Sequence, residues 1–522
     1  MLLSSEQWPE AVYTGTQARE LDRLAIEEAG VDGFALMSQA GRAAFQAIKQ
    51  YWPKVSTLLI LCGSGNNGGD GFIIAALAKA EGYSVRLGLH GAAEKVSGDA
   101  ATAMRQAIDA GVEIEEPQAL TELIHQPAAD VLMVDALLGT GLNRPLRESV
   151  LDLIVAINQS PLPVVSIDVP SGLDADTGVM RPKAIKADLT LTFIAMKAGL
   201  LTGDGVNCVG RLLLSPLSVP DTVFSKLKPV CNRLDLYRLL DGLPPRDPGA
   251  HKGHAGHVLI VGGDSGMGGA ALLAASAAAR CGAGLTSCAT RPEHAAAVMA
   301  SRPEIMSRGV AHGDALKPMI ERSSVIAIGP GLGRDAWGRE LFARVLEHCG
   351  SRPLVIDADG LFLLKQWLAE HGTLPLTGPV VLTPHPGEAA TLLDCQTTDI
   401  QADRIKAAHQ LVDLVPGDGP VAAVLKGAGS LIAARGDVLG LSRYGNPGMA
   451  SGGMGDVLTG VIAALLAQGL SVGEASRLGV CLHGAAADLA ARRGQRGLLA
   501  SDLLPALRQL LNRVSKEVAG AE

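Results

Sequence analysis

The amino-acid sequence predicts an α/β protein whose sheets are largely parallel and buried on both faces. Short apolar runs rich in β-branched residues recur along the chain, and segments of helical character separate them. Apolar and polar residues do not alternate within these runs, whereas they do alternate in strands that have one face in water. Apolar residues make up 48% of the 522 residues, aromatic residues only 3%, and 63 residues are glycine. This composition is typical of α/β enzymes with tight turns between strands and helices.

The expected elements follow one another in a regular order. A helical segment at 16–52, with a break near 30–33, precedes the first strand. Strands are expected at 57–62, 84–89, 131–137, 164–169 and 189–194 in the first half, and at 257–261, 324–328, 353–356, 380–382, 421–425 and 430–434 in the second. The longest apolar stretches, 269–279 and 457–470, are too short to cross a bilayer and are expected as core helices.

The chain is too long for one ordinary hydrophobic core, so two or three domains are expected. Residues 216–253 are dense in proline and charge and include the sequence LPPRDPG. We therefore predict a first domain at 1–225 and a second at 226–522. The glycine clusters of the two halves differ in layout, which argues against an internal repeat.

Charge and cysteine content narrow the class of protein. The net charge of −8 argues against a nucleic-acid backbone or an anionic membrane as main partner and favours small-molecule substrates. Eight cysteines are scattered without a CxxC pair, and the first ten residues lack the features of a signal peptide. We expect a cytoplasmic protein with reduced thiols. Its small-residue faces suit a core as well as an interface, and a homo-oligomer is expected.

The first candidate site is the segment GSGNNGGDG at 63–71, which follows the first expected strand and precedes an expected helix at 72–80. A strand, a glycine loop and a helix in this order can hold a phosphate or a dinucleotide. The segment does not fit GxGxxG, and it has no lysine for a Walker loop. The oxygens of Asn66, Asn67 and Asp70 could instead bind sugar hydroxyls or a hard monovalent cation.

Two further polar clusters are expected at the same edge of the sheet, where the strands end. One is DALLGTGLNRP, which begins at Asp135, and the other is SIDVPSGLDADTG, in which Asp168 ends a strand. Lys197, in FIAMKAGL, could join them, although it could also be a solvated surface lysine. Each cluster alone could be an ordinary turn capped by Asp or Asn. Three such turns on one edge favour a shared binding site.

Together these motifs resemble the NAD(P)H-hydrate epimerase family, the YjeF N-terminal domain, over roughly residues 10–215. The resemblance implies a Rossmann-like three-layer fold, hydrated NADH or NADPH as substrate, and a potassium ion. Potassium would be bound by Asn67, Asp135 and Ser171. Asp168 would contact the hydrated nicotinamide as the acid–base group, with Lys197 a weaker catalytic candidate. The dinucleotide would be held by Asn66, Asn67, Gly68, Gly69 and Asp70, and by Gly139, Thr140, Gly141, Leu142, Asn143, Arg144 and Pro145.

The second candidate site centres on NPGMASGGMGDVLTG at 446–460. This reads as a glycine loop that leads into the first turn of a buried helix. The N–H groups of Gly453 and Gly455 can approach an anion closely, and Asp456 could take a proton from a substrate hydroxyl. The alternative is a helix start whose glycines serve packing only.

Four more motifs accompany Asp456 in the second half. HKGHAGHVLIVGG at 251–263 opens the domain, and GPGLG at 329–333 follows a strand. LTPHPGE presents His385 on a turn braced by two prolines, and KGAGS at 426–430 lies between two expected strands. Taken alone, His385 would be read as a core histidine bonded to backbone.

The set, with DADGL at 357–361, resembles the ribokinase-like superfamily and, within it, the ADP/ATP-dependent NAD(P)H-hydrate dehydratases, over about 230–515. The implied reaction is phosphorylation of the C6 hydroxyl by ADP or ATP with Mg²⁺, followed by elimination of phosphate. Asp456 would be the base. Residues implied to contact the hydrate are Ala270, Gly331 or Gly333, His385 and Asp456, and those implied to contact the nucleotide are Lys426, Gly427, Ala428, Gly429, Ser430 and Gly455.

Both resemblances indicate one bifunctional enzyme in which the first half epimerises the R and S hydrates and the second consumes the S form. Two alternatives remain at this point. The chain could be a small-molecule hydroxyl kinase, because phosphoryl transfer to any alcohol needs the parts found around Asp456. The first half could also be a dinucleotide-binding module without catalytic activity.

Overall fold

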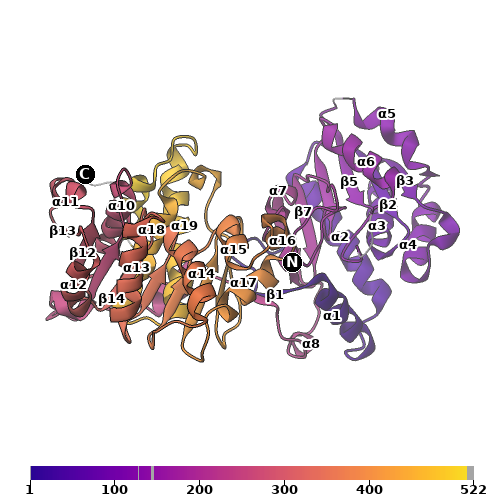
Figure 1. Ribbon diagram of the computed structural model, residues 1–522. Helices are drawn as coiled ribbons and strands as arrows, with labels where there is room; N and C mark the ends of the chain where they lie inside the picture. Colours follow the sequence, from indigo (N-terminus) through magenta and orange to yellow (C-terminus); the bar gives the residue numbers. More distant parts are fainter. Residues whose placement is uncertain (1, 127, 143–145, 514–522) are drawn as a thin grey trace. The chain divides into compact units, whose positions relative to one another are not determined.

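The structure is a computed structural model, and it describes residues 2–126, 128–142 and 146–513. The chain divides into two compact units, Met1–Asn232 and Arg233–Glu522 (Figure 1). The division falls shortly after the predicted boundary at residue 225. Strand β10 (Cys231–Arg233) still pairs with β1 (Ala11–Tyr13) of the first unit, which extends that unit past the predicted end.

The first unit is built on a seven-stranded parallel sheet with the order β4-β3-β2-β5-β6-β7-β9. In chain order this is 3-2-1-4-5-6-7, the doubly wound arrangement in which the strand order reverses between the first and fourth strands. The strands are β2 (Thr57–Gly63), β3 (Ser84–His90), β4 (Ile114–Glu115), β5 (Val131–Ala136), β6 (Val164–Ile167), β7 (Leu189–Phe193) and β9 (Arg211–Ser215).

Helices cover both faces of this sheet, as the uninterrupted apolar strands require. Leu58 and Ile60 of β2 lie in one core cluster, whereas Leu59 and Leu61 lie in another. The helices are α1 (Gly15–Glu27), α2 (Gly33–Tyr51), α3 (Asn66–Ala80), α4 (Gly98–Asp109), α5 (Thr121–Ile124), α6 (Glu148–Gln159), α7 (Gly205–Cys208) and α8 (Asp221–Phe224). A short strand β8 (Met196–Lys197) pairs in parallel with β1.

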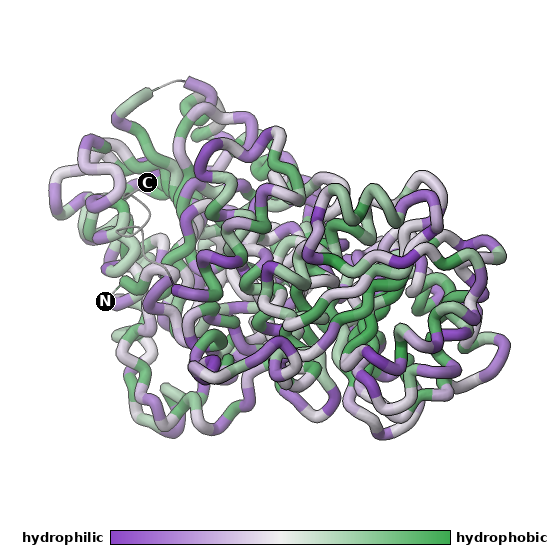
Figure 2. The backbone as a smooth tube through the Cα atoms, turned by 90° about the vertical axis from the view of Figure 1, so that its left-hand side faces the viewer, coloured by the Kyte–Doolittle hydropathy of each residue, from purple (hydrophilic) through white to green (hydrophobic). Residues whose placement is uncertain are grey.

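The second unit holds the strand order β13-β12-β11-β14-β15-β16-β17-β18-β19, parallel as far as β17 and antiparallel beyond it. The strands are β11 (His257–Val261), β12 (Leu285–Thr290), β13 (Met306–Gly309), β14 (Val325–Ile328), β15 (Leu354–Ile356), β16 (Val380–Leu382), β17 (Val421–Leu425), β18 (Ser430–Ala434) and β19 (Gly440–Ser442). Figure 2 shows hydrophobic and hydrophilic stretches in turn along the backbone.

Both faces of this second sheet are buried too. Val258 and Ile260 of β11 pack into a core shared with α10, α18, α19 and α20, and Leu259 between them is also fully buried. The helices are α9 (Leu236–Asp241), α10 (Gly268–Arg280), α11 (Pro292–Ser301), α12 (Lys317–Arg322), α13 (Ala336–Cys349), α14 (Asp359–His371), α15 (Pro386–Leu392), α16 (Thr397–Ala402), α17 (Arg404–Asp413), α18 (Met454–Ala467), α19 (Val472–Ala490) and α20 (Leu503–Leu511).

Two helices begin earlier than the sequence predicts. The expected helix at 72–80 begins at Asn66, so most of the glycine-rich segment is the first turns of α3 and not a loop. Likewise α18 begins at Met454, which places Gly455 and Asp456 inside its first turn. Glycine normally disfavours a helix by about 1 kcal/mol. Here it permits close packing, because a Cβ on Gly71 would lie 2.5 Å from the Cys62 Sγ.

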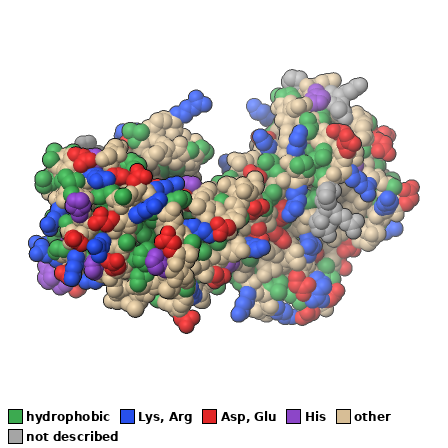
Figure 3. Space-filling model, viewed as in Figure 1, with side chains coloured by type: hydrophobic (Ala, Val, Ile, Leu, Met, Phe, Trp, Pro, Cys, Tyr) green, Lys and Arg blue, Asp and Glu red, His purple; other side chains and the backbone are tan. Residues whose placement is uncertain are grey.

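The surface shown in Figure 3 mixes acidic and basic side chains without a large area of one sign. No helix in the described part of the chain has the length and apolarity needed to cross a bilayer.

Candidate active sites

The first candidate site is a cavity of about 650 Å³ in the first unit, at the point where the strand order reverses. Strand β2 leads into α3 there, and the neighbouring β5 leads into the segment that follows Asp135. In open parallel sheets, ligands bind at this crevice beyond the carboxyl ends of the strands. The position of the cavity therefore follows from the strand order.

The structure brings most of the predicted epimerase residues together. Those that line the cavity are Asn66, Asn67, Asp70, Gly139, Thr140, Gly141, Leu142, Asp168 and Lys197. Gly68 lies behind the cavity wall, where a Cβ would be 1.8 Å from the Gly63 carbonyl oxygen, and a Cβ on Gly69 would meet the Met37 side chain. The predicted residues Asn143, Arg144 and Pro145 lie outside the described residues.

Asp168 and Lys197 form an ion pair on the cavity wall. The Nζ of Lys197 lies 2.6 Å from Oδ1 of Asp168, and it also donates to Oγ1 of Thr192 at 2.9 Å and to the Phe193 carbonyl oxygen at 2.7 Å. The Lys197 side chain is 2% exposed, so the reading as a solvated surface lysine is wrong. Asp168 has a φ of 64°, a strained conformation for a residue with a Cβ, which turns its carboxylate toward the lysine.

The three predicted potassium ligands are oxygen-bearing and buried or nearly so. Oδ2 of Asp135 accepts from the Ser166 hydroxyl at 2.7 Å and from the Ser171 N–H at 2.9 Å, and Oδ1 accepts from the Ser171 hydroxyl at 2.6 Å. Burial raises the pKa of Asp135, although these hydrogen bonds oppose the rise. Both polar atoms of the Asn67 amide are buried and have no hydrogen-bond partner within the described chain.

Sequence reasoning missed several groups that the fold brings to this cavity. Asp22, on α1, lines it, and burial raises the pKa of the Asp22 carboxyl. The pKa of Asp70 is raised well above its usual value by burial first, and then by the charges of Asp168 and Asp22. Arg19, His90, Lys95, Asp99 and Arg147 also line the cavity. Asp22 and these five residues, unlike Asp70, lie in no quoted motif and are far apart in the sequence, so only the fold reveals them.

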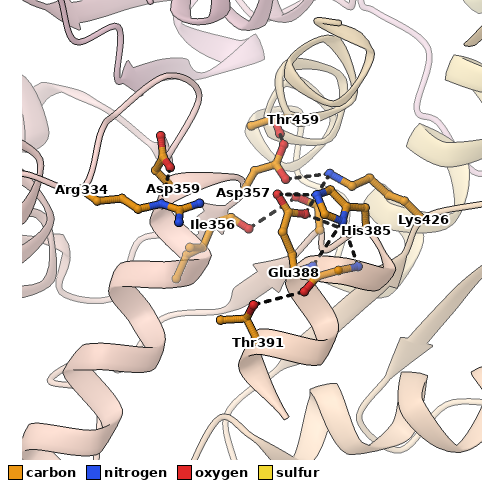
Figure 4. A network of polar contacts seen from close by, with 11 residues as sticks. Arg334, Ile356, Asp357, Asp359, His385, Glu388, Thr391, Lys426 and Thr459 are labelled. Carbon is orange, nitrogen blue, oxygen red and sulfur yellow. Dashed lines mark hydrogen bonds and ion pairs between the residues drawn. The ribbon is translucent and has the colours of Figure 1, made fainter. Parts of the chain in front are cut away.

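The second candidate site lies at the carboxyl edge of the sheet in the second unit. Asp357 follows β15, the segment ending in His385 follows β16, and Lys426 follows β17. Adjacent parallel strands end at one edge, so these three residues meet there (Figure 4). Asp456 lies in the first turn of α18, and its negative charge helps to raise the pKa of Lys426.

Lys426 is the centre of a charged network. Its Nζ lies 2.9 Å from Oδ1 of Asp357 and 3.6 Å from Oε2 of Glu388. Burial lowers the pKa of Lys426, but these carboxylates outweigh burial and raise it. The hydroxyl of Thr459, on α18, donates to the other Asp357 oxygen at 2.6 Å. Asp357, Glu388 and Thr459 had no predicted role, although all three lie inside quoted motifs.

Asp456 is largely buried, and both acidic and basic side chains lie near it. Its pKa is raised to about 6, by burial first and then by the Asp357 carboxylate, while Lys426 opposes the rise. Gly453 precedes the helix with a φ of 88°, which favours glycine. A Cβ on Gly455 would lie 3.2 Å from the Lys426 Nζ, so this glycine lets the ammonium approach the helix start. The arrangement can hold an anion and supply a base beside it.

His385 lies at the start of α15 with its side chain 57% exposed, so the alternative of a core histidine is wrong. Its Nδ1 accepts hydrogen bonds from the N–H groups of Gly387 at 3.0 Å and Glu388 at 3.2 Å. Because Nδ1 is an acceptor, the proton of the neutral ring lies on Nε2. This Nε2 lies 3.4 Å from Oε1 of Glu388.

The remaining predicted hydrate contacts surround a left-handed turn after β14. Gly331 has a φ of 58°, and a Cβ there would lie 3.1 Å from the Cβ of Ala270, at the start of α10. Gly333, with a φ of 74°, donates its N–H to Asp359 at 3.0 Å. Both glycines are therefore required by the backbone itself, whatever they bind.

Comparison with known proteins decides the family. Residues 33–199 match the model described as YjeF-related protein N-terminus, and residues 258–509 match the model of NAD(P)H-hydrate dehydratase. The Bifunctional NAD(P)H-hydrate repair enzyme Nnr of Coxiella burnetii is 42% identical over 96% of this chain and 99% of that protein. The chain belongs to the family of bifunctional NAD(P)H-hydrate repair enzymes.

The enzyme of the same name from Escherichia coli is also 42% identical, over 97% of this chain and 94% of its own length. A solved structure of a hypothetical protein from Streptococcus mutans is 28% identical, with a TM-score of 0.50, and covers 54% of this chain and 99% of that one. The fold class predicted for this repair enzyme, a Rossmann-like domain followed by a ribokinase-like domain, is confirmed.

Proposed function

We propose that the two units carry out successive steps of NAD(P)H-hydrate repair. The first unit interconverts the R and S hydrates, and the second converts the S hydrate back to NADH or NADPH at the expense of ADP or ATP. The observation that carries this is the position of Asp456, in the first turn of α18 beside Lys426. Asp456 could therefore act as the base beside a site of phosphoryl transfer.

In the second unit Asp456 takes the proton of the C6 hydroxyl as the hydroxyl oxygen attacks the terminal phosphoryl group. Lys426, the loop from Gly427 to Ser430 and the N–H of Gly455 stabilise the phosphate charge. The nucleotide enters with Mg²⁺ as its complex, and the ion offsets part of that charge. Phosphate then leaves from C6 with the electron pair of its C–O bond, and loss of the C5 proton restores the C5=C6 double bond.

His385, Ala270 and Gly331 or Gly333 are the proposed contacts of the hydrate in this unit. The His385 side chain is exposed, and its Nε2–H can turn from the Glu388 carboxylate, 3.4 Å away, to an amide or hydroxyl oxygen of the hydrate. Gly331 and Ala270 lie side by side, since a Cβ on Gly331 would be 3.1 Å from the Ala270 Cβ.

In the first unit Asp168 is the proposed acid–base group, and Lys197 holds its carboxylate in place at 2.6 Å. Inversion at C6 needs loss and return of the hydroxyl, or opening of the ring, and either route requires a group that gives and takes a proton. The segments 66–70 and 139–145 are proposed to hold the dinucleotide.

Potassium fits the oxygen donors proposed for it. Asn67 has a buried carbonyl oxygen without a hydrogen-bond partner in the described chain, which an ion would satisfy. Asp135 supplies a buried carboxylate and Ser171 a hydroxyl. When bound, the ion would supply positive charge near the dinucleotide phosphates.

The deciding experiment follows the return of reduced-nicotinamide absorbance from mixed R and S hydrates, with ADP or ATP, Mg²⁺ and K⁺. Wild type should recover all the material, and Asp456→Asn should stop recovery. Asp168→Ala should leave fast recovery of the S fraction and reduce the rest to the slow spontaneous rate. An unchanged rate in Asp168→Ala would mean that the first unit only binds. A stable phosphorylated product would favour a hydroxyl kinase instead.

We also propose that the enzyme is cytoplasmic and forms a homo-oligomer. Sedimentation of the purified chain tests the second point, since a monomer across micromolar concentrations would contradict it. Fractionation of cells tests the first.

A further inference from the structure

Arg404 is the largest fully buried side chain of the described protein, and it lies beneath the nucleotide loop. It is the first residue of α17 and is 2% exposed. Its Nη2 donates to the carbonyl oxygens of Leu425 at 3.4 Å, Lys426 at 3.3 Å and Gly429 at 3.5 Å. Its Nη1 donates to Oε1 of Gln401 at 3.0 Å. One guanidinium thus contacts three carbonyls at both ends of the segment 425–429.

These contacts determine which way the loop presents its amides. In a trans peptide, the carbonyl and the following N–H point in opposite directions. The Lys426 carbonyl faces Arg404, so the Gly427 N–H points away from the guanidinium. The peptide one step earlier shows the same geometry, because the Lys426 N–H donates to the Pro384 carbonyl oxygen at 2.9 Å. Arg404 therefore fixes the peptide that offers its N–H to a phosphate.

The loop closes tightly on the guanidinium. A Cβ on Gly427, whose φ is 137°, would lie 3.0 Å from Nη2 and 3.1 Å from Nη1 of Arg404. This gives Gly427 a reason to be glycine that is separate from any contact with the nucleotide. The loop also braces itself, since the Ser430 hydroxyl donates to the Gly427 carbonyl oxygen at 3.0 Å.

The charge of Arg404 matters as well as its shape. Burial lowers the pKa of Arg404 to about 10, so the guanidinium remains charged near neutral pH. A buried cation just below a phosphate site attracts the phosphate more strongly than an exposed one, because less water screens it.

We propose that Arg404 is a positioning residue for the nucleotide: it holds the segment from Lys426 to Ser430 in its phosphate-binding shape and adds positive charge from beneath. The inference rests on the proposed nucleotide-dependent function of the second unit. Arg404 would thus strengthen nucleotide binding through the loop above it, without contacting the nucleotide itself.

The chain offers a matched control in Arg435, at the other end of β18 and about 16 Å along the strand. Its guanidinium also bonds four backbone carbonyls, those of Gly417, Gly419, Val412 and Val415. Arg404→Gln and Arg435→Gln each remove a guanidinium that bonds several loop carbonyls, of which only the first is fully buried and borders the predicted nucleotide site. Arg404→Lys keeps the positive charge but loses the planar guanidinium group that bonds several carbonyls at once.

The test measures Kd for Mg-ADP and Mg-ATP by calorimetry on the full chain, with KM for nucleotide and for hydrate and with thermal unfolding. Arg404→Gln should weaken nucleotide binding at least tenfold and leave the hydrate KM within twofold, with Arg404→Lys in between. Arg435→Gln should lower the unfolding temperature and leave the nucleotide Kd within twofold.

Equal nucleotide Kd in Arg404→Gln and wild type would overturn the inference, as would equal losses in both glutamine variants. Should Arg404→Gln fail to fold, Arg404→Lys must still weaken nucleotide binding relative to hydrate binding. If wild type binds nucleotide but does not dehydrate the hydrate, the proposed function fails, and the Kd series still decides the role of Arg404.

Discussion

At the scale of the residue, Asp456 shows how environment sets chemistry. An ordinary aspartate would be a weak base at neutral pH, whereas this carboxyl has a pKa raised to about 6 by burial and by Asp357. That value lies close to the working pH, where a general base is most effective. Lys426 keeps the rise moderate, so the group remains ionised at pH 7.

The dehydratase rate should therefore depend on pH with an inflection near 6. The base must be ionised, so kcat/KM for the S hydrate should be constant above pH 7 and fall about tenfold per unit well below 6. A pH series from 5 to 8, with the R hydrate removed, measures it. A kcat/KM that stays constant from pH 5 to 8 would contradict the environment described for Asp456.

Replacing Asp357 with asparagine should move that inflection to lower pH. The negative charge that raises the pKa of Asp456 is lost, while Lys426 still lowers it. Asp359→Asn is the matched control: its charge acts in the same direction but contributes least, and Arg334 partners it at 2.8 Å. A smaller shift in Asp357→Asn than in Asp359→Asn would contradict the larger effect of the Asp357 charge on Asp456.

At the scale of the element, α18 is held against α10 at very short range. A Cβ on Gly460 would lie 2.0 Å from the Ala274 carbonyl oxygen, so only glycine allows the two helices to approach this closely. The N-terminus of α18 carries Asp456, and this packing therefore sets the position of the base.

Gly460→Ala should destabilise the second unit by ~1–3 kcal/mol, because the helices must move apart, despite the better helix propensity of alanine. It should also reduce dehydratase activity more than epimerase activity. Denaturant unfolding and the two rates measure this. The control is Gly419→Ala, where a Cβ would have no neighbour within 4 Å. Equal stability of the two variants would contradict the close packing.

The sequence predicted the elements unevenly, and the reason is physical. Strand β11 has the predicted bounds, and β2 is one residue longer, because their apolar runs end at turn-forming residues. Strand β12 was not predicted, since its sequence LTSCAT is largely small and polar, although the sheet buries most of it. Strands β1, β4, β8, β9, β10, β13 and β19 were missed as well, and all are five residues or shorter.

At the scale of the whole molecule, the two units have separate hydrophobic cores. The core cluster of the second unit begins at Leu234, and the buried residues of the two clusters in the first unit end at Val223. Separate cores predict separate unfolding transitions.

Calorimetry of the full chain should therefore show two transitions with different ligand responses. At 100 times its Kd, Mg-ATP should add about 2.7 kcal/mol to one unit, which is several degrees, and should leave the other unchanged. Replacing Na⁺ with K⁺ should raise the unfolding temperature of the first unit. The Asp456→Asn variant should still show two separate unfolding transitions. A single transition that responds to both ligands would contradict independent units.

The sequence alone determined the fold class, the motifs and, through their resemblance, the family. These depend on local apolar runs and on short glycine-bearing segments, which a sequence displays directly. Tertiary structure alone placed Asp22 in the epimerase cavity, buried Lys197 against Asp168, and seated Arg404 beneath the nucleotide loop. Burial and charge pairing act between residues far apart in the chain, so no local pattern records them.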